Sequence, residues 1–248
     1  MKGRVALVTG GGRGIGRETA LLLAAAGARV MIVARSAGEL ADVGPDYVAA
    51  DLGTAEGCAL AVAETERRLG PIDALVVNHG IGSAHERLVW EQDPAVWRDT
   101  MRINLDGPFE LARLTVGGMC RRGYGRVVFT SSTAGEKAER SGSAYSASKH
   151  GLIGLARALA QDAGPFNVTS NAVLPGWVRT AMAERSAAMN AQQRGISVEQ
   201  VWRERAAIYP QNRVLEPVEV ARVIAFLCSE AAGGVNGEAI TVALGGMW

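Results

Sequence analysis

Short apolar runs rich in β-branched residues alternate with longer stretches rich in alanine and leucine along most of the chain. This alternation is typical of parallel strands joined by crossover helices, and continuously apolar runs indicate strands that are covered on both faces. We predict seven strands, at residues 5–9, 29–34, 47–50, 74–77, 126–130, 167–173 and 239–242. The expected fold class is α/β: a single-domain Rossmann fold with a doubly wound, seven-stranded parallel sheet and helices on both faces.

Helical composition fills the intervals between these strands. The predicted helices cover residues 15–26, 55–69, 94–122, 144–161 and 217–229. Gly27, Gly70 and Gly123 stand where helices commonly stop. Residues 36–46 leave space for only about one or two helical turns between the second and third strands.

The segment 180–210 differs from these connections, because it follows a strand end but has the composition of helices, with a break at Arg194-Gly195-Ile196. Ser197 and Gln200 have capping-box spacing for a second short helix. Insertions at the carboxyl edge of an open α/β sheet usually cover the ligand crevice. We therefore expect one domain over residues 1–248 with a substrate lid at about 180–212, the alternative being a purely structural excursion.

Charge and composition restrict the partners. The 26 basic and 25 acidic side chains give a net charge of +1, so no global field draws the chain to nucleic acid or to an anionic membrane. No apolar run approaches the ~18 residues that a membrane span requires. A small-molecule partner is expected, with neither nucleic acid nor membrane.

Cysteine and histidine placement excludes the usual metal patterns. Cys58, Cys120 and Cys228 lie far apart and form no CxxC pair, which argues against a zinc site and against a disulfide framework. They indicate buried thiols in a reducing cytosol, and the first motif begins too early for a signal peptide, so a cytoplasmic protein is expected. His79, His85 and His150 have no metal-ligand spacing and are interpreted as structural or solvated. No metal is expected.

A glycine-rich turn, TGGGRGIG at residues 9–16, lies between the first predicted strand and helix. Glycines in this place let the backbone turn sharply and bring a helix N-terminus against a pyrophosphate, although glycine also serves ordinary tight turns. The residues expected to contact a dinucleotide here are Gly10, Arg13, Gly14, Ile15 and Gly16.

The end of the second strand indicates which dinucleotide is bound. Folds that hold NAD usually place an acid about 20 residues beyond the loop, whereas an arginine there accommodates a 2′-phosphate. Arg35 stands at this position beside Ser36, with no acid next to it, and Arg13 is able to reach the same phosphate. NADP(H) is the predicted cofactor, unless Arg35 merely solvates a strand end.

Tyr145 and Lys149 are four residues apart and so share one face of a predicted helix. A neighbouring ammonium favours the phenolate and lowers a pKa that is otherwise about 10, which makes the phenol a usable acid or base. By itself this spacing is also compatible with a solvated helix face. Ser132 at the end of the fifth strand and Asn104 further upstream complete the candidate catalytic set.

With these residues in order, the chain resembles the short-chain dehydrogenase/reductase family over nearly its whole length. The shared motifs are TGGGRGIG at 9–16, Asp51-Leu52, Val77-Asn78-His79-Gly80, Ile103-Asn104-Leu105, Ser131-Ser132, YSASK at 145–149 and Pro175-Gly176-Trp177-Val178-Arg179-Thr180. The motifs YSASKHG and the C-terminal GGMW are similar to those of bacterial 3-oxoacyl thioester reductases and polyketide ketoreductases.

The resemblance implies roles for the four catalytic candidates. Tyr145 would donate the proton to a carbonyl oxygen during reduction, and Lys149 would hold the nicotinamide ribose and lower the pKa of Tyr145. Ser132 would hydrogen-bond the substrate oxygen where negative charge develops, and Asn104 would anchor a water in a proton relay.

The resemblance also implies further cofactor contacts. They are Asp51 and Leu52 at the adenine, Asn78 and Gly80 at the adenosine ribose side, and Pro175, Gly176, Val178 and Thr180 at the nicotinamide amide. Two motifs depart from the family: Val77 and His79 replace an Asn and an Ala, and the segment 243–246 lacks the acid that commonly precedes its glycine pair.

The expected function is NADPH-dependent reduction of a ketone, reversible toward oxidation of a secondary alcohol. The predicted lid is rich in Ala and Met with Trp202 and Tyr209, which favours an apolar substrate unless these residues only bury one helix face. The resemblance implies an acyl thioester or a polyketide-like ketone. The alternatives are an alcohol or sugar dehydrogenase working oxidatively, and an NADP-binding regulator without catalysis.

Two expectations concern packing. Trp177 either lines the substrate pocket or packs under the lid. The helix that carries Tyr145 has small and apolar residues almost all round, which favours burial on two sides and therefore an oligomer. The resemblance implies a homotetramer, with a homodimer as the alternative.

Overall fold

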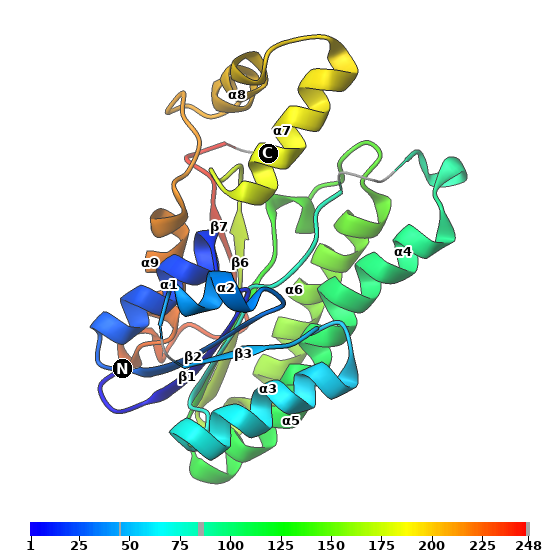
Figure 1. Ribbon diagram of the computed structural model, residues 1–248. Helices are drawn as coiled ribbons and strands as arrows, with labels where there is room; N and C mark the ends of the chain where they lie inside the picture. The colour runs from blue at the N-terminus through cyan, green and yellow to red at the C-terminus, as the bar shows by residue number, and fades with distance from the viewer. Residues whose placement is uncertain (45, 84–86, 247–248) are drawn as a thin grey trace.

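The computed structural model describes residues 1–44, 46–83 and 87–246. Its centre is one parallel sheet with the strand order β3-β2-β1-β4-β5-β6-β7 (Figure 1). The strands are β1 (Val5–Thr9), β2 (Arg29–Ala34), β3 (Tyr47–Ala49), β4 (Ala74–Val77), β5 (Gly125–Thr130), β6 (Val168–Pro175) and β7 (Ala239–Val242). The predicted α/β class and the seven parallel strands are confirmed. β6 runs two residues further than predicted, because Leu174 and Pro175 still pair with β7.

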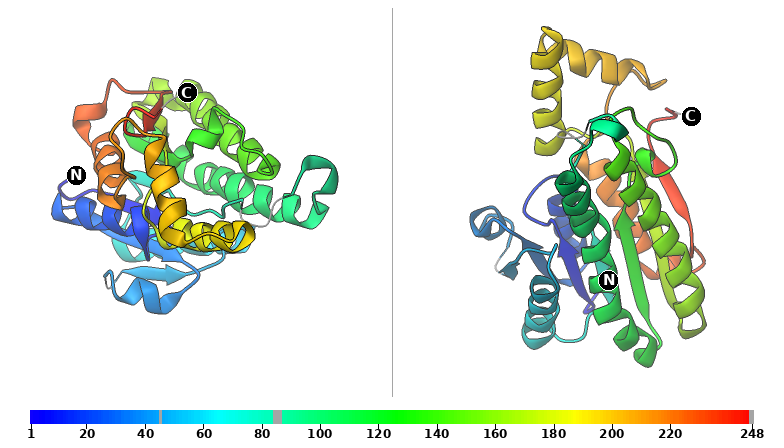
Figure 2. Two further views of the ribbon diagram at one scale, coloured as in Figure 1. Left: turned by 90° about the horizontal axis from the view of Figure 1, so that it is seen from above. Right: turned by 90° about the vertical axis from the view of Figure 1, so that its right-hand side faces the viewer.

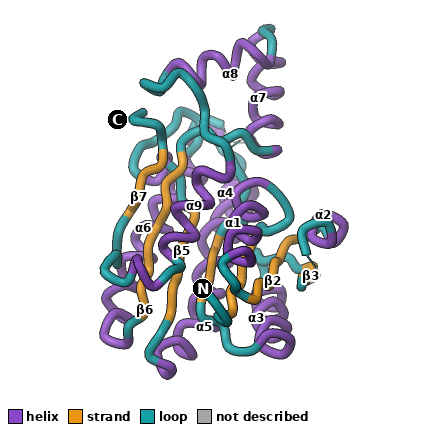
Figure 3. Tube along the Cα trace, turned by 90° about the vertical axis from the view of Figure 1, so that its left-hand side faces the viewer, coloured by secondary structure: helices purple, strands orange, loops and turns teal. Residues whose placement is uncertain are grey.

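Helices cover both faces of this sheet. They are α1 (Gly14–Ala25), α2 (Ala37–Ala41), α3 (Ala55–Leu69), α4 (Pro94–Met101), α5 (Gly107–Arg122), α6 (Ser143–Ala163), α7 (Ala181–Arg194), α8 (Val198–Ala207) and α9 (Pro217–Leu227). Helices α3, α5 and α6 lie on one face, and α1 and α9 lie on the other (Figures 2 and 3).

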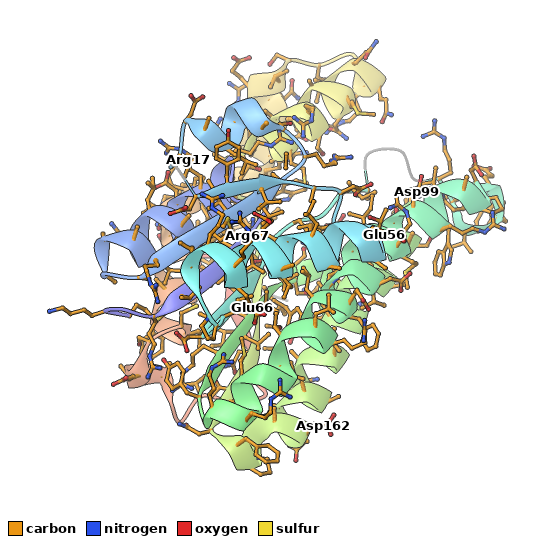
Figure 4. The ribbon with its side chains drawn as sticks, turned by 60° about the horizontal axis from the view of Figure 1, so that its bottom comes forward. Arg17, Glu56, Glu66, Arg67, Asp99 and Asp162 are labelled. Carbon is orange, nitrogen blue, oxygen red and sulfur yellow. The ribbon has the colours of Figure 1, made fainter. Side chains whose placement is uncertain are left out.

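The alternation of side chains along a strand explains these two layers. In β1, Leu7 belongs to the core under α3 and α5, whereas Ala6 and Val8 belong to the core under α1 and α9. The outer faces of the helices are charged, as Glu56, Glu66 and Arg67 show on α3 (Figure 4). No helix in the described part of the chain is long and apolar enough to cross a membrane.

The predicted helix 94–122 is wrong in one respect, because the structure divides it at a π-helical turn, Arg102–Asp106. In this turn the Gly107 N–H donates to the Arg102 carbonyl, five residues back. Pro108 has no N–H, so it cannot make the regular α-helical hydrogen bond to the Asn104 carbonyl. The turn therefore presents Asn104 from a locally widened helix, a device frequent at functional sites.

Residues 180–212 form a helical excursion above the carboxyl edge of the sheet, which Figure 1 shows as α7 and α8. Gly195, with φ +65°, ends α7, and the Ser197 hydroxyl accepts a hydrogen bond from the Gln200 N–H to start α8. The two ends of the excursion meet, because the Arg179 N–H donates to the Leu215 carbonyl and the Leu215 N–H to the Trp177 carbonyl. The chain thus leaves the fold and returns to it at one place.

Candidate active site

The predicted site residues converge at the carboxyl edge of the sheet. The chain order reverses between β1 and β4, and in such sheets ligands bind at the point of reversal. The loops after β1, β4, β5 and β6 meet there, together with the π-helical turn and the first half of α6.

The loop between β1 and α1 forms a cradle that side chains would fill. A Cβ on Gly16 would lie 2.2 Å from the Gly10 carbonyl oxygen and 2.6 Å from Asn78 Nδ2. Gly10 and Gly14 adopt positive φ angles of +64° and +54°. The loop therefore depends on glycine both for its turns and for its packing.

The N-terminus of α1 fits an anionic group. Its N-cap residue, Arg13, makes no side-chain capping hydrogen bond, whereas Thr54 and Thr180 cap α3 and α7 with their hydroxyls. The first N–H groups of a helix need an acceptor, and they carry the positive end of its dipole. A dinucleotide pyrophosphate suits this cradle in both shape and charge.

Asn78, His79 and Gly80 bring the end of β4 against this loop. The Asn78 N–H donates to Thr9 Oγ1 at 2.9 Å, and its side-chain amide donates to the Gly10 carbonyl at 3.5 Å. A Cβ on Gly80 would lie 3.1 Å from Asn104 Oδ1 and 3.7 Å from Lys149 Nζ. The predicted cofactor residues of β1 and β4 are thus neighbours of two predicted catalytic residues.

His79 occupies the place where the family motif usually has a small side chain. Its ring is buried, with Nδ1 2.8 Å from Thr9 Oγ1, and burial lowers its pKa to about 3, so the ring is neutral. Nε2 makes no hydrogen bond of ordinary geometry, and the nearby Ile103 carbonyl offsets the lowering only in part. A Cβ on Gly107 would lie 3.3 Å from Nε2. His79 therefore packs the end of β1 against the π-helical turn.

Asn104 is fully buried, and its side chain is held by both backbone groups of one residue, Ile81. Its Oδ1 accepts from the Ile81 N–H at 2.8 Å, and its Nδ2 donates to the Ile81 carbonyl at 2.9 Å and to Ser148 Oγ at 3.2 Å. This pairing fixes the loop after β4 to the π-helical turn and to α6.

Lys149 and Tyr145 lie together on α6. Lys149 Nζ is 5.7 Å from the centre of the Tyr145 ring and donates to the Thr130 carbonyl at 2.9 Å. Lys149 is buried, and the loss of hydration lowers its pKa from 10.5 to about 8. The sequence prediction that these two side chains share a helix face is confirmed.

Ser132 lies two residues beyond the end of β5 and caps a short 3-10 turn, accepting a hydrogen bond from the Ala134 N–H at 3.1 Å. Ser131 beside it donates its hydroxyl hydrogen to the Lys149 carbonyl at 2.8 Å. The end of β5 is therefore attached to the backbone of α6 at the residue that supplies the ammonium.

The remaining predicted cofactor residues differ in what they present. The Asp51 carboxylate accepts from the Gly53 N–H and lies 3.7 Å from Arg102, and it is exposed. Leu52 is buried in the core, so its side chain cannot face an adenine and only its backbone is available. Arg35 and Ser36 are exposed at the end of β2.

Residues after β6 approach the loop between β1 and α1, residues 9–16, which we call the phosphate loop. A Cβ on Gly14 would lie 3.2 Å from the Thr180 methyl group, and a Cβ on Gly82 would lie 3.5 Å from Met182 Sδ. Gly176 leaves room for Tyr209, whose hydroxyl accepts from the Trp177 N–H at 2.6 Å. The first turn of α7 therefore adjoins both the loop after β1 and the loop after β4. The structure brings Pro175, Gly176, Val178 and Thr180 to this same edge.

Trp177 packs under the helical excursion, as one of the two interpretations of this residue predicted. The Arg205 guanidinium lies 3.7 Å from the Trp177 ring centre and 4.9 Å from that of Trp202. Arg205 also donates to the Ala183 carbonyl and to Ser186 Oγ, each at 3.0 Å. We call Trp177, Trp202 and Arg205 the lid stack, after the expectation that residues 180–212 form a substrate lid. It is held by side-chain contacts, and the sequence gives no signal for the contact of Arg205 with Trp177.

Within the part of the chain that the structure describes, the other titratable groups show no metal site. Among residues 1–44, 46–83 and 87–246, no three His, Cys, Asp or Glu side chains are grouped so as to hold a metal ion. His150 is exposed and its Nδ1 lies 2.9 Å from the Ser146 carbonyl oxygen, while His85 lies outside the described residues. Cys58 and Cys228 are buried, and burial raises the thiol pKa to about 11 and about 12 respectively.

A family model for short chain dehydrogenases matches residues 4–191. The chain belongs to this family. An acetoacetyl-CoA reductase of Shinella zoogloeoides is 37% identical over 248 residues, with 96% of each chain covered. A putative ketoacyl reductase of Streptomyces coelicolor is 36% identical, covering 96% of this chain and 95% of its own. This short-chain dehydrogenase is therefore an oxidoreductase of the class that acts on carbonyl and alcohol groups.

Solved structures agree with the assignment. Levodione reductase superposes with a TM-score of 0.93 at 32% identity, covering 99% of this chain and 98% of its own. A variant of actinorhodin polyketide ketoreductase with NADPH superposes with a TM-score of 0.91 at 35% identity, covering 98% of both chains. The fold of this short-chain dehydrogenase extends over nearly the whole of both neighbours.

Two site features escaped the sequence analysis. Glu39 forms an ion pair with Arg13 of the phosphate loop. Its position four residues after Arg35 was a signal in the sequence that an acid could lie near the cofactor edge. Arg205 is the charged centre of the lid stack, although its neighbour Arg203 on the same helix is exposed.

Proposed function

We propose that this enzyme reduces a ketone to a secondary alcohol with NADPH, and catalyses the reverse reaction as well. The observation that carries the proposal is the buried Lys149 ammonium, which lies beside the Tyr145 ring and next to Gly80 of the cofactor cleft. Burying a cation costs free energy of folding, and buried charges of this kind are frequent at functional sites. Here the ammonium would stabilise the phenolate of Tyr145 and so make the phenol a better proton donor.

In the proposed mechanism Tyr145 donates its proton to the ketone oxygen, and Ser132 hydrogen-bonds the same oxygen as charge develops on it. Lys149 stabilises the resulting phenolate. Asn104, locked by Ile81 and Ser148, positions the relay through which the phenol recovers its proton. A bound nicotinamide dinucleotide would supply the hydride.

The residues proposed to hold the cofactor fall into three groups. Gly10, Gly14, Ile15 and Gly16 would hold the pyrophosphate at the N-terminus of α1. Asp51, the Leu52 backbone, Asn78 and Gly80 would face the adenosine. Lys149, Tyr145, Pro175, Gly176, Val178 and Thr180 would hold the nicotinamide riboside.

NADPH is the proposed cofactor because two arginines, one at the end of β2 and one in the loop between β1 and α1, are available to bind a 2′-phosphate. Arg35 is exposed at the end of β2, with Ser36 next to it, and Arg13 projects from the phosphate loop. The ketoreductase neighbour solved with NADPH supports the same choice.

The proposed substrate is an apolar ketone, either an acyl thioester or a polyketide-like compound. The excursion 180–212, which we propose as the substrate lid, encloses an apolar cluster that includes Ala187, Val201 and Trp202. Relatives named as acetoacetyl-CoA reductase and ketoacyl reductase support this class.

The experiment is a turnover assay of the purified enzyme with NADPH and with NADH. It uses acetoacetyl thioesters and bicyclic ketones in reduction, and polyols in oxidation. We expect fast oxidation of NADPH with one of the apolar ketones and much slower oxidation of NADH. Turnover of polyols alone, or equal rates with both cofactors, would refute the corresponding part of the proposal.

We also propose a homotetramer or homodimer that works in the cytoplasm. Helix α6 has small residues on its outer side, such as Gly154, where an added Cβ would meet nothing within 4 Å, so a second subunit has room to pack there. Cys58 and Cys228 are free thiols, which suits a reducing compartment. Light scattering at the mass of a monomer would refute the oligomer.

A further inference from the structure

Arg13 forms an ion pair with an acid, Glu39. Its Nη1 lies 2.8 Å from Glu39 Oε1, and the two side chains are 50% and 40% exposed. Glu39 belongs to α2, the single-turn helix between β2 and β3. Its side chain packs against the phosphate loop, because a Cβ on Gly12 would lie 3.1 Å from Glu39 Cβ and 3.5 Å from Oε2. The carboxylate therefore lies at the rim of the cofactor loop.

A carboxylate at this rim acts against a 2′-phosphate in two ways. It neutralises the guanidinium that the phosphate would use, and it repels the phosphate's own negative charge. Neither effect bears on a cofactor whose ribose carries a free 2′-hydroxyl. Arg13 is therefore a shared group, able to pair with either Glu39 or the phosphate.

We propose that Glu39 holds Arg13 in the free enzyme and competes for it with the 2′-phosphate of the cofactor, which reduces the preference for NADPH over NADH. This inference rests on the proposed use of NADP(H) at the same site. Glu39 is then a residue that sets cofactor specificity without taking part in the chemistry.

The expected effect is moderate because the pair is exposed. Exposed ion pairs contribute little and are screened by salt, so we expect Glu39→Gln to tighten NADPH binding by about three- to tenfold at low ionic strength, and by less at high salt. Binding of NADH should stay within about twofold of the wild type.

The experiment is a binding titration that needs no turnover. Dissociation constants of NADPH, NADH and adenosine 2′,5′-bisphosphate are measured for the wild type and for Glu39→Gln at low and at high salt. The matched control is Glu64→Gln, which removes the carboxylate of another exposed Glu–Arg pair. Glu64 lies in the second half of α3. The cofactor edge of the sheet adjoins the other end of this helix, its N-terminus, which follows β3. The control should bind all three ligands as the wild type does.

The Arg13→Ala background tests whether the effect passes through Arg13. The proposal predicts that Glu39→Gln gains less there than in the wild type, since no guanidinium is left to release. An equal gain in both backgrounds would mean that Glu39 repels the phosphate directly, and would overturn the competition for Arg13.

The outcomes separate the inference from the proposed function. Preference of the wild type for NADH, with no loss of NADPH binding in Arg35→Ala, would refute the NADP(H) assignment itself. Preference for NADPH that depends on Arg35, combined with unchanged binding in Glu39→Gln, would overturn only the role of Glu39. The inference is supported if Glu39→Gln binds NADPH more tightly while Glu64→Gln does not, and if the gain is smaller in the Arg13→Ala background.

Discussion

The phosphate loop and the lid stack lie at the same edge of the sheet but are held in different ways. The phosphate loop is fixed by backbone: Gly16 meets the Gly10 carbonyl so closely that no side chain fits between them. The lid stack is fixed by side chains, with Arg205 between two indole rings. One region tolerates almost no change of residue type at its glycines, whereas the other depends on side-chain contacts between helix α8 and Trp177. We give the name rigid region to the phosphate loop together with the adjoining Ser132, Tyr145 and Lys149. We expect cofactor binding and chemistry to reside in this region and substrate selection in the region of the lid stack.

The largest effect is expected within the rigid region. Tyr145→Phe removes only the hydroxyl, and general acid catalysis typically contributes about 10² to 10⁴ in rate, so kcat should fall by that factor. The affinity for NADPH should stay near that of the wild type, because the ring and Lys149 remain. Stopped-flow turnover and cofactor titration measure the two quantities, and near-normal turnover would refute the role of the phenol.

Burial of Lys149 predicts a pH-dependent stability. Its folded pKa of about 8 lies below the ordinary 10.5, so the folded state binds fewer protons than the unfolded state between these values. The cost of burying the charge is present below pH 8 and is relieved as the pH rises toward 10.5, by up to about 3 kcal/mol.

The comparison that isolates this contribution is Lys149→Met against the wild type, by urea unfolding at pH 7 and at pH 9.5. The variant should be the more stable protein at pH 7, and the difference should shrink at pH 9.5. A difference that does not change with pH would show that Lys149 is not held in a desolvated site.

A substitution of His79 tests whether the end of β1 and the π-helical turn are packed as one unit. His79→Ala leaves a cavity between Thr9 and the π-helical turn and removes a buried hydrogen bond, so the free energy of unfolding should fall by about 2 kcal/mol. Because Asn104 is attached to the same turn, kcat should fall more than the affinity for NADPH. His150→Ala, on an exposed position, is the control, and it should change neither quantity.

The smallest effect in this series belongs to the lid stack. Arg205→Met keeps much of the side chain's volume but loses the stacked charge and two hydrogen bonds, so the lid should be less firmly placed and the KM for an apolar ketone should rise about tenfold. NADPH affinity should not change. Arg203→Met, from the exposed side of the same helix, is the matched control. A loss of cofactor affinity in Arg205→Met would show that the two regions are not separable.

The rigid region was predictable from sequence because its requirements are local. The glycines of the phosphate loop, the four-residue spacing of Tyr145 and Lys149, and the strand ends all follow from backbone geometry, and the structure brings these residues together. The π-helical turn was missed because Pro108 can also stand in the first turn of a helix, so its presence did not reveal the widened turn before it.

The pairing of side chains was not predictable. Arg205 lies on the same face of the predicted helix as Val201 and Trp202, whereas Arg203 does not, but this spacing does not reveal that Arg205 contacts Trp177 when α8 packs on it. Glu39 was passed over for a similar reason, because its contact with Arg13 depends on how the short helix α2 folds back on the loop. Leu52 was expected at the adenine, but the buried apolar position next to an exposed Asp51 leaves only its backbone there.

The central claim is that the Lys149 ammonium makes the Tyr145 proton mobile. The pH dependence of kcat for oxidation of a secondary alcohol, at saturating NADP⁺, tests it in the wild type, in Lys149→Arg and in Lys149→Met. The claim predicts that the wild-type rate rises with an apparent pKa clearly below about 10, the ordinary value for a phenol, that Lys149→Arg keeps much of this shift, and that Lys149→Met moves the rise to pH 10 or above. The same pH profile in all three proteins would contradict it.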